Sequence, residues 1–142
     1  MPNRLLIVED DYFWADELSR GLASAGAIVL GPAASVAAAL EILDREPCVD
    51  AAILDIKLRG TRAYAVADRL LERAVPFLIL SGYDSSDLPT AYARTPWLEK
   101  PVSLTVTLKA LDALLPSDRR MPEPPGSRLH GRRRPSVINS SP

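Results

Sequence analysis

Short apolar runs alternate with amphipathic segments along most of this chain, and this alternation limits the folds it can adopt. Five runs have the composition of buried strands, at residues 4–8, 27–30, 51–54, 76–80 and 97–99. Apolar residues recur at helical spacing in four intervening or following segments, at residues 12–25, 35–45, 63–73 and 104–115. Strands that alternate with helices form parallel sheets, because a parallel neighbour requires a crossover connection. The pattern therefore predicts an α/β fold, with a five-stranded parallel sheet that is doubly wound by helices.

The fourth crossover differs from the others. Pro89 and Pro96 leave room between Gly82 and Trp97 for only a short or irregular helix, since proline is disfavoured in a helix interior. We expect this fourth helix to be shortened or mobile.

The chain divides into one domain at residues 1–116 and a tail at residues 117–142. The domain holds 16 acidic and 11 basic residues, whereas the tail holds 2 acidic and 6 basic ones. Five of the 13 prolines lie in the tail, which has almost no apolar periodicity. Such a segment buries too little apolar surface to offset its ordering entropy, so we predict a disordered basic tail.

Several classes of protein are disfavoured by composition. Cys48 is the only cysteine, which rules out an intramolecular disulfide and a cysteine-rich metal site. His130 is the only histidine and lies in the tail, so the folded part lacks the usual general base. No apolar run approaches the roughly 18 residues of a membrane span, and the N-terminus lacks the features of a secretory signal. We expect a cytoplasmic protein.

Polar residues, and in one case also a glycine, follow four of the five predicted strands at the point where each ends. In chain order they are Glu9, Asp10, Asp11, Asp55, Ser81, Gly82 and Lys100. In open α/β sheets, ligands bind at the carboxyl ends of the strands. These residues are therefore predicted to meet at one edge.

Clustered carboxylates of this kind favour a divalent cation. Two carboxylates about 4 Å apart repel by roughly 4 kcal/mol at an effective dielectric constant near 20. Oxygen ligands without histidine or cysteine suit Mg²⁺ better than zinc, and Mn²⁺ can substitute. The same arrangement suits phosphoryl transfer, with Asp55 as the candidate nucleophile. Asp11 is expected to cap the following helix instead, and acids rather than glycines after the first strand disfavour nucleotide binding.

Taken together, residues 4–115 resemble the response-regulator receiver domains. The resemblance implies the flavodoxin-like strand order 2-1-3-4-5. It implies that Asp55 is the phosphoacceptor, that Asp10 contacts Mg²⁺ and that Glu9 holds a metal-bound water. It also implies that the backbone carbonyl of Lys57 is a further metal ligand.

The remaining motif residues are assigned by the same resemblance. Ser81 resembles the hydroxyl residue that hydrogen-bonds the phosphoryl group, with the Gly82 backbone N–H assisting. Lys100 resembles the lysine that pairs with the phosphoryl oxygens, and its peptide bond to Pro101 is cis in the family. Trp97 occupies the position of the aromatic switch residue, where a tyrosine or phenylalanine is usual.

One segment resembles a subgroup of the family. Pro76-Phe-Leu-Ile-Leu-Ser-Gly-Tyr83 is similar to the Pro-Phe-x-Phe-Ala-Thr-Gly-Tyr motif of alphaproteobacterial single-domain receivers, although Ile79, Leu80 and Ser81 replace its Phe, Ala and Thr. Tyr83 is a candidate partner contact. Because Trp97 is bulkier than the usual switch residue, ordering of residues 82–93 is predicted to report phosphorylation instead.

The predicted function is that of a phosphoacceptor in a two-component or phosphorelay system, not a metabolic enzyme. Its expected partners are a sensor histidine kinase or phosphotransfer protein and an unidentified downstream protein. Only 26 residues follow Pro116, so no DNA-binding domain is expected, and the chain acts either as a stand-alone regulator or as a phosphate sink. Two alternatives remain: a Mg²⁺-dependent phosphatase with an aspartyl nucleophile, which usually carries an acid where Lys57 stands, and a receiver fragment of a hybrid kinase.

Overall fold

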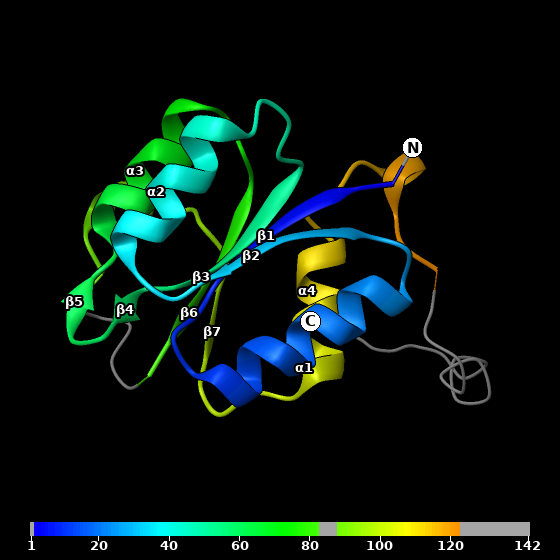
Figure 1. Ribbon diagram of the computed structural model, residues 1–142, viewed down its shortest axis with the longest axis horizontal. Helices are drawn as coiled ribbons and strands as arrows, with labels where there is room; N and C mark the ends of the chain where they lie inside the picture. The colour runs from blue at the N-terminus through cyan, green and yellow to red at the C-terminus, as the bar shows by residue number, and fades with distance from the viewer. Residues whose placement is uncertain (1, 83–87, 123–142) are drawn as a thin grey trace.

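A five-stranded parallel sheet forms the centre of the molecule (Figure 1). The computed structural model describes residues 2–82 and 88–122. The strands are β1 (Arg4–Val8), β2 (Ile28–Ala33), β3 (Ala51–Asp55), β6 (Phe77–Ser81) and β7 (Trp97–Glu99). Their order in the sheet is β2-β1-β3-β6-β7, which is the predicted order 2-1-3-4-5 when the sheet strands alone are counted. The predicted fold class is confirmed.

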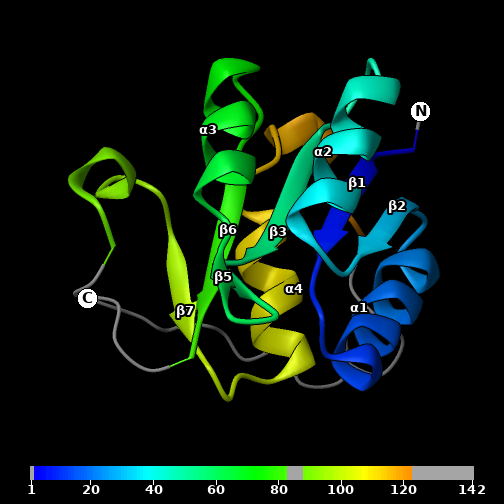
Figure 2. The ribbon, with the colours of Figure 1, turned by 60° about the vertical axis from the view of Figure 1, so that its left-hand side comes forward.

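Two layers of helices cover the sheet, one on each face (Figures 1 and 2). The first consists of α1 (Tyr12–Ser24) and α4 (Leu104–Asp112), and the second of α2 (Val36–Arg45) and α3 (Tyr64–Glu72). Side chains alternate between these layers along each strand. In β1, Leu5 and Ile7 join the apolar cluster under α1 and α4, whereas Leu6 and Val8 join the cluster under α2 and α3. A strand buried on both faces needs an unbroken apolar run, as the sequence shows.

Side chains cap three of the four helices at their N-termini. Asp11 accepts hydrogen bonds from the backbone N–H groups of Phe13 and Trp14, and Ser35 and Ser103 cap α2 and α4 in the same way. Each cap satisfies backbone donors that have no partner within the helix. The predicted capping role of Asp11 is confirmed.

A small hairpin between β3 and α3 was not predicted. Its strands are β4 (Lys57–Leu58) and β5 (Thr61–Arg62), which pair antiparallel. The turn residues Arg59 and Gly60 have φ angles of 50° and 83°. Two positive φ angles are the signature of the tight turn that matches the twist of a hairpin, and glycine adopts them readily.

Strand β2 extends further than predicted, through Pro32 to Ala33. Proline is tolerated there because β2 lies at the edge of the sheet. Gly31 has a φ of 91°, and a Cβ atom at this position would lie 2.9 Å from the carbonyl oxygen of Ile7. The extension therefore requires glycine at that position.

The fourth crossover contains the short 3₁₀ helix η2 (Thr90–Tyr92), which confirms the prediction of a short or irregular helix. The prediction that the connection between Gly82 and Trp97 is mobile falls partly on residues 83–87, outside the described residues.

The prediction that disorder begins at residue 117 is wrong for the first six residues. Ser117–Arg119 forms the 3₁₀ helix η3, and Arg119 exchanges hydrogen bonds with Asn3 next to β1. Contacts with a partner 116 residues earlier in the chain leave no local trace in the sequence. The rest of the predicted tail lies outside the described residues. Within the described part of the chain, none of the helices is long and apolar enough to cross a membrane.

Candidate functional site

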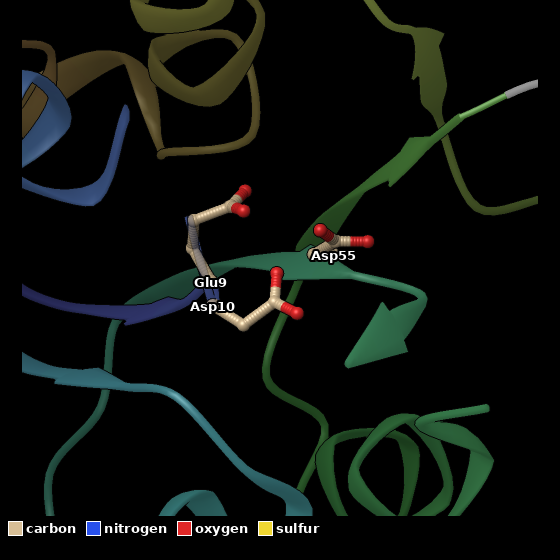
Figure 3. A group of neighbouring side chains, drawn as sticks. All are labelled: Glu9, Asp10 and Asp55. Carbon is tan, nitrogen blue, oxygen red and sulfur yellow. The ribbon is translucent and has the colours of Figure 1, made fainter. Parts of the chain in front are cut away.

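Three carboxylates meet at the carboxyl end of the sheet (Figure 3). Glu9 and Asp10 directly follow β1, and Asp55 is the last residue of β3. Because β1 and β3 are parallel neighbours in register, with Val8 opposite Leu54, their ends bring these acids together. One oxygen from each carboxylate lies within 4.8 Å of the other two. Glu9 and Asp55 are buried, whereas Asp10 is half-buried.

Lys100 brings a positive charge to the same place. Its Nζ atom donates a hydrogen bond of 2.9 Å to Oδ2 of Asp55 and lies 3.2 Å from the Glu9 carboxylate. The backbone N–H of Lys100 donates to the carbonyl oxygen of Ser81 at 2.7 Å, which fixes the residue just beyond β7. The cis peptide bond expected between Lys100 and Pro101 is present.

These neighbours shift the acid–base properties of the site. Burial of Glu9, followed by the charge of Asp55, raises the pKa of Glu9 to about 7, although the Asp11 backbone N–H and Lys100 act in the opposite direction. Burial of Lys100 lowers its pKa, but its contacts with Asp55 and Glu9 outweigh this and leave the pKa of Lys100 raised. Lys100 is therefore a firmly protonated counter-ion.

Backbone donors hold the other two acids. The Lys57 N–H donates to Oδ1 of Asp55 at 3.0 Å, and the Arg59 N–H donates to Oδ2 of Asp10 at 2.8 Å. Arg59 lies in the turn of the unpredicted hairpin, so the hairpin positions Asp10. This contribution of Arg59 is not predicted from the sequence, although Gly60 is a recognisable turn signal.

Solved structures similar to this chain decide its family. SdrG from Sphingomonas melonis Fr1 is 33% identical over 80% of this chain and 96% of SdrG, with a TM-score of 0.68. A response regulator receiver protein from Sinorhizobium medicae WSM419 is 22% identical, over 80% and 94% of the two chains, with a TM-score of 0.67. A CheY-like receiver domain from Methylobacillus flagellatus is 24% identical, over 80% and 99%, with a TM-score of 0.66. This chain belongs to the response-regulator receiver family.

No family model matches this receiver, and no curated protein matches it. Two-component signalling is the context in which receiver domains act, and they work with histidine kinases or phosphotransfer proteins.

The receiver's carboxylates fit a hard divalent cation. Among residues 2–82 and 88–122, none donates a hydrogen bond to the buried Oε1 of Glu9, although the Lys100 ammonium lies 3.2 Å away. A buried carboxylate oxygen without a hydrogen bond is costly unless a cation approaches it. Oxygen donors from two acids beside it match the ligand preference of Mg²⁺. The residues present therefore suit the ion that receiver domains typically bind.

The remaining predicted residues take different positions around the site. Ser81 is buried at the end of β6, and Gly82, with open space where a Cβ would point, lines a cleft together with Lys100 and Pro101. Trp97 is 43% exposed on β7 and does not occupy an inward pocket in this structure. Tyr83 lies outside the described residues.

Trp14, Asp11 and Val102 also line this cleft. The Nε1 atom of Trp14 is buried without a hydrogen-bond partner in the described part of the chain, and the residue lies beside Asp11 and Lys100 in the cleft. Its apolar position in α1 predicted packing, and the ring does contact the apolar cluster under α1 and α4. The spacing of apolar residues along a helix predicts that Trp14 packs, but it does not predict which cleft the indole ring lines.

Proposed function

We propose that Asp55 of this receiver accepts a phosphoryl group from a partner histidine kinase or phosphotransfer protein in a Mg²⁺-dependent reaction. One observation carries the proposal. The Asp55 carboxylate lies among Glu9, Asp10 and Lys100, so acids that attract a cation and a lysine that attracts anionic oxygens surround a single candidate nucleophile. Phosphoryl transfer depends chiefly on such positioning and charge neutralisation.

The transfer would proceed at an oxygen of Asp55. That oxygen attacks phosphorus of a phosphohistidine, a P–O bond forms, and the P–N bond breaks. The imidazole nitrogen keeps the electron pair of the broken bond, and a ring protonated on its other nitrogen leaves as neutral histidine. Lys100, whose Nζ atom lies 2.9 Å from Oδ2 of Asp55, would pair with the incoming phosphoryl oxygens. Ser81 would donate its hydroxyl to the same group, with help from the Gly82 N–H.

Glu9, Asp10 and Asp55 would hold the ion, with the carbonyl of Lys57 as a further ligand. When bound, Mg²⁺ neutralises charge on the transferring phosphoryl oxygens. The chain's own contribution is to keep the carboxylates together, since Lys57 and Arg59 fix Asp55 and Asp10 through backbone hydrogen bonds. Mn²⁺ should support the reaction because it accepts the same oxygen ligands.

The signal would leave the receiver by contact with another protein, or the receiver would act as a phosphate sink that drains its kinase. The lifetime of phospho-Asp55 and the rate of back-transfer to the kinase separate these two roles. The proposed location is the cytoplasm, where such kinases present their phosphohistidine.

The proposal is tested by incubating the protein with acetyl phosphate and Mg²⁺ and measuring its intact mass. We expect one added phosphoryl group in the wild type and none in Asp55→Asn. Asp44→Asn, which changes an exposed acid on α2, is the matched control and should be labelled like the wild type. An unmodified wild type, or equal labelling of Asp55→Asn, would contradict the proposal. Continuous hydrolysis of a generic phosphate ester by the wild type would indicate a phosphatase.

A further inference from the structure

Tyr92 differs in burial from the other described residues of the connection between β6 and β7, the two strands that end at the site. The chain leaves the site at Ser81, the end of β6, and returns to it at Lys100, just after β7. Among residues 82 and 88–99, the described part of this connection, Tyr92 is the only buried residue, with 4% of its surface exposed. Among its described residues, the connection is therefore held to the rest of the domain by one buried side chain, and we call Tyr92 the anchor.

The anchor holds η2 against α3. The Tyr92 hydroxyl donates to Oδ1 of Asp68 at 2.7 Å and lies 3.3 Å from the backbone carbonyl oxygen of Tyr64. The two tyrosine rings also pack at a centroid distance of 5.7 Å. Tyr64 and Asp68 are one turn apart on α3, so both contacts attach to the same face of that helix.

The chemistry of the pair keeps it a donor and an acceptor. Burial of Tyr92, followed by its hydrogen bond to Asp68, raises the pKa of the phenol. Tyr92 therefore retains its proton at physiological pH. A hydrogen bond to a charged acceptor contributes more than one between neutral groups.

Both ends of the connection are tied directly to the site. The Lys100 N–H donates to the carbonyl of Ser81 at 2.7 Å, and the Ile79 N–H donates to the carbonyl of Pro96 at 2.9 Å. Movement of Ser81 or Lys100 toward a phosphoryl group on Asp55 must be absorbed in the residues between them. Trp97 lies there too, but at 43% exposure it has no inward contact comparable to that of Tyr92.

We infer that Tyr92 and Asp68 form a latch that holds η2 on α3 in the resting receiver and opens when Asp55 is phosphorylated. The inference rests on the proposed function, since it needs a phosphoryl group on Asp55. It identifies α3 as the helix that responds to phosphorylation. Tyr92 acts here as a positioning residue, because it touches neither the carboxylates nor the transferring group.

The test compares the affinity for beryllofluoride, which mimics the acyl phosphate, in the presence of Mg²⁺. Tyr92→Phe removes the hydroxyl and keeps the ring, and Asp68→Ala removes the acceptor. If the latch opposes activation, both variants should bind beryllofluoride about three- to tenfold more tightly than the wild type. Asp68→Asn keeps an acceptor oxygen and should restore most of the wild-type affinity. Tyr64→Phe keeps the backbone acceptor and the ring, so it is the matched control and should equal the wild type.

Backbone amide chemical shifts of α3 provide a second readout. In the wild type, residues of α3 should shift on addition of beryllofluoride, and in Tyr92→Phe their resting shifts should already lie toward the activated values. The double variant Tyr92→Phe/Asp68→Ala should bind no more tightly than either single variant, because the two substitutions break one interaction. Asp68 is itself exposed, so Asp68→Ala carries the test if Tyr92→Phe folds poorly.

The outcomes distinguish failure of the latch from failure of the proposed function. A wild type that binds no beryllofluoride overturns the proposed function and the latch together. A wild type that binds it, with unchanged or weaker binding in both Tyr92→Phe and Asp68→Ala, overturns the latch alone and makes the pair purely structural.

Discussion

The two ends of the sheet both carry buried or half-buried charged side chains, but these charges are paired differently. At the amino end of the strands, Arg4 pairs with Glu46, Arg119 lies 3.3 Å from Asp50, and Asn3 exchanges hydrogen bonds with Arg119. Positive and negative groups are matched there. Such pairs stabilise the fold modestly and do not create a binding site.

At the carboxyl end the charges are not matched. One ammonium, that of Lys100, faces the two buried acids Glu9 and Asp55, while Asp10 stands beside them. Burial, followed by the charge of Asp55, raises the pKa of Glu9, and among the described residues none donates a hydrogen bond to its Oε1. The same residue types therefore have different effects. Where positive and negative charges are equal in number they stabilise the fold, and where acids are in excess they form a cluster that suits a cation.

The largest effect is expected from Asp10→Asn. Removing this carboxylate should weaken Mg²⁺ binding by roughly a hundredfold, because a buried cation loses one of its paired charges, worth about 3 kcal/mol. Isothermal titration calorimetry with Mg²⁺ measures this loss of affinity. Asp11→Asn is the matched control: asparagine also caps helices, and the carboxylate it replaces is bonded to Phe13 and Trp14. Equal loss in both variants would mean that Mg²⁺ senses only the general negative charge.

These acids could be predicted from sequence because their position depends only on local pattern. One apolar run ends at Val8 and another at Leu54, and parallel pairing then places the acids that follow them at one edge. The strand order and the cis bond before Pro101 came from resemblance to a family. Periodicity alone does not determine either.

The features that escaped prediction depend on partners distant in the chain. Tyr92 and Asp68 are 24 residues apart, and Arg119 and Asn3 are 116 apart. A tyrosine in a proline-rich connection looks like a surface residue, and an arginine in a basic tail looks like solvated charge. In both cases tertiary packing decides the outcome, and a single sequence carries no record of it.

The next largest effect concerns pH. In the unliganded protein the pKa of Glu9 is about 7, above its ordinary value of 4.5, so between these values the folded state binds more protons than the unfolded state. The stability contributed by protonated Glu9 is present below pH 4.5 and is lost as the pH rises through 7. We expect the free energy of unfolding to fall across this window, by an amount on the order of 2 kcal/mol.

Thermal melts from pH 4.5 to 7.5 measure this dependence, with Glu9→Gln as the reference because its side chain does not titrate. The difference between the two proteins should narrow when Mg²⁺ is added at the upper end of the range, since the ion favours the charged carboxylate. A wild type whose pH dependence parallels that of Glu9→Gln would mean that Glu9 is ionised throughout.

A smaller effect is expected from Lys100→Ala. Removing the ammonium takes away a positive charge that competes with the ion, so Mg²⁺ should bind about tenfold more tightly. Phosphorylation by acetyl phosphate should persist, whereas the response of α3 to beryllofluoride should be reduced. Lys109→Ala, on α4, is the control for loss of a lysine. Weaker Mg²⁺ binding in Lys100→Ala would show that the lysine organises the carboxylates instead of competing with the ion.

The smallest effect is expected from Arg119→Ala at the amino end. The substitution removes hydrogen bonds to Asn3 and Asp50 from a side chain that is 33% exposed, so the free energy of unfolding should fall by about 1 kcal/mol. Arg20→Ala, which breaks the exposed pair with Asp16, should change it by less than about 0.5 kcal/mol. Chemical denaturation measures both changes.

Mg²⁺ affinity in Arg119→Ala decides whether the two ends are independent. Balanced pairs at the amino end share no partner with the carboxylates, and distant sites without shared partners are additive within about 0.5 kcal/mol. Mg²⁺ binding should therefore equal that of the wild type, and Asp10→Asn/Arg119→Ala should show the sum of the single effects on stability. A change in Mg²⁺ affinity would instead mean that the strands transmit strain from the η3 contacts to the carboxylates, and the contrast between a structural end and a functional end would have to be abandoned.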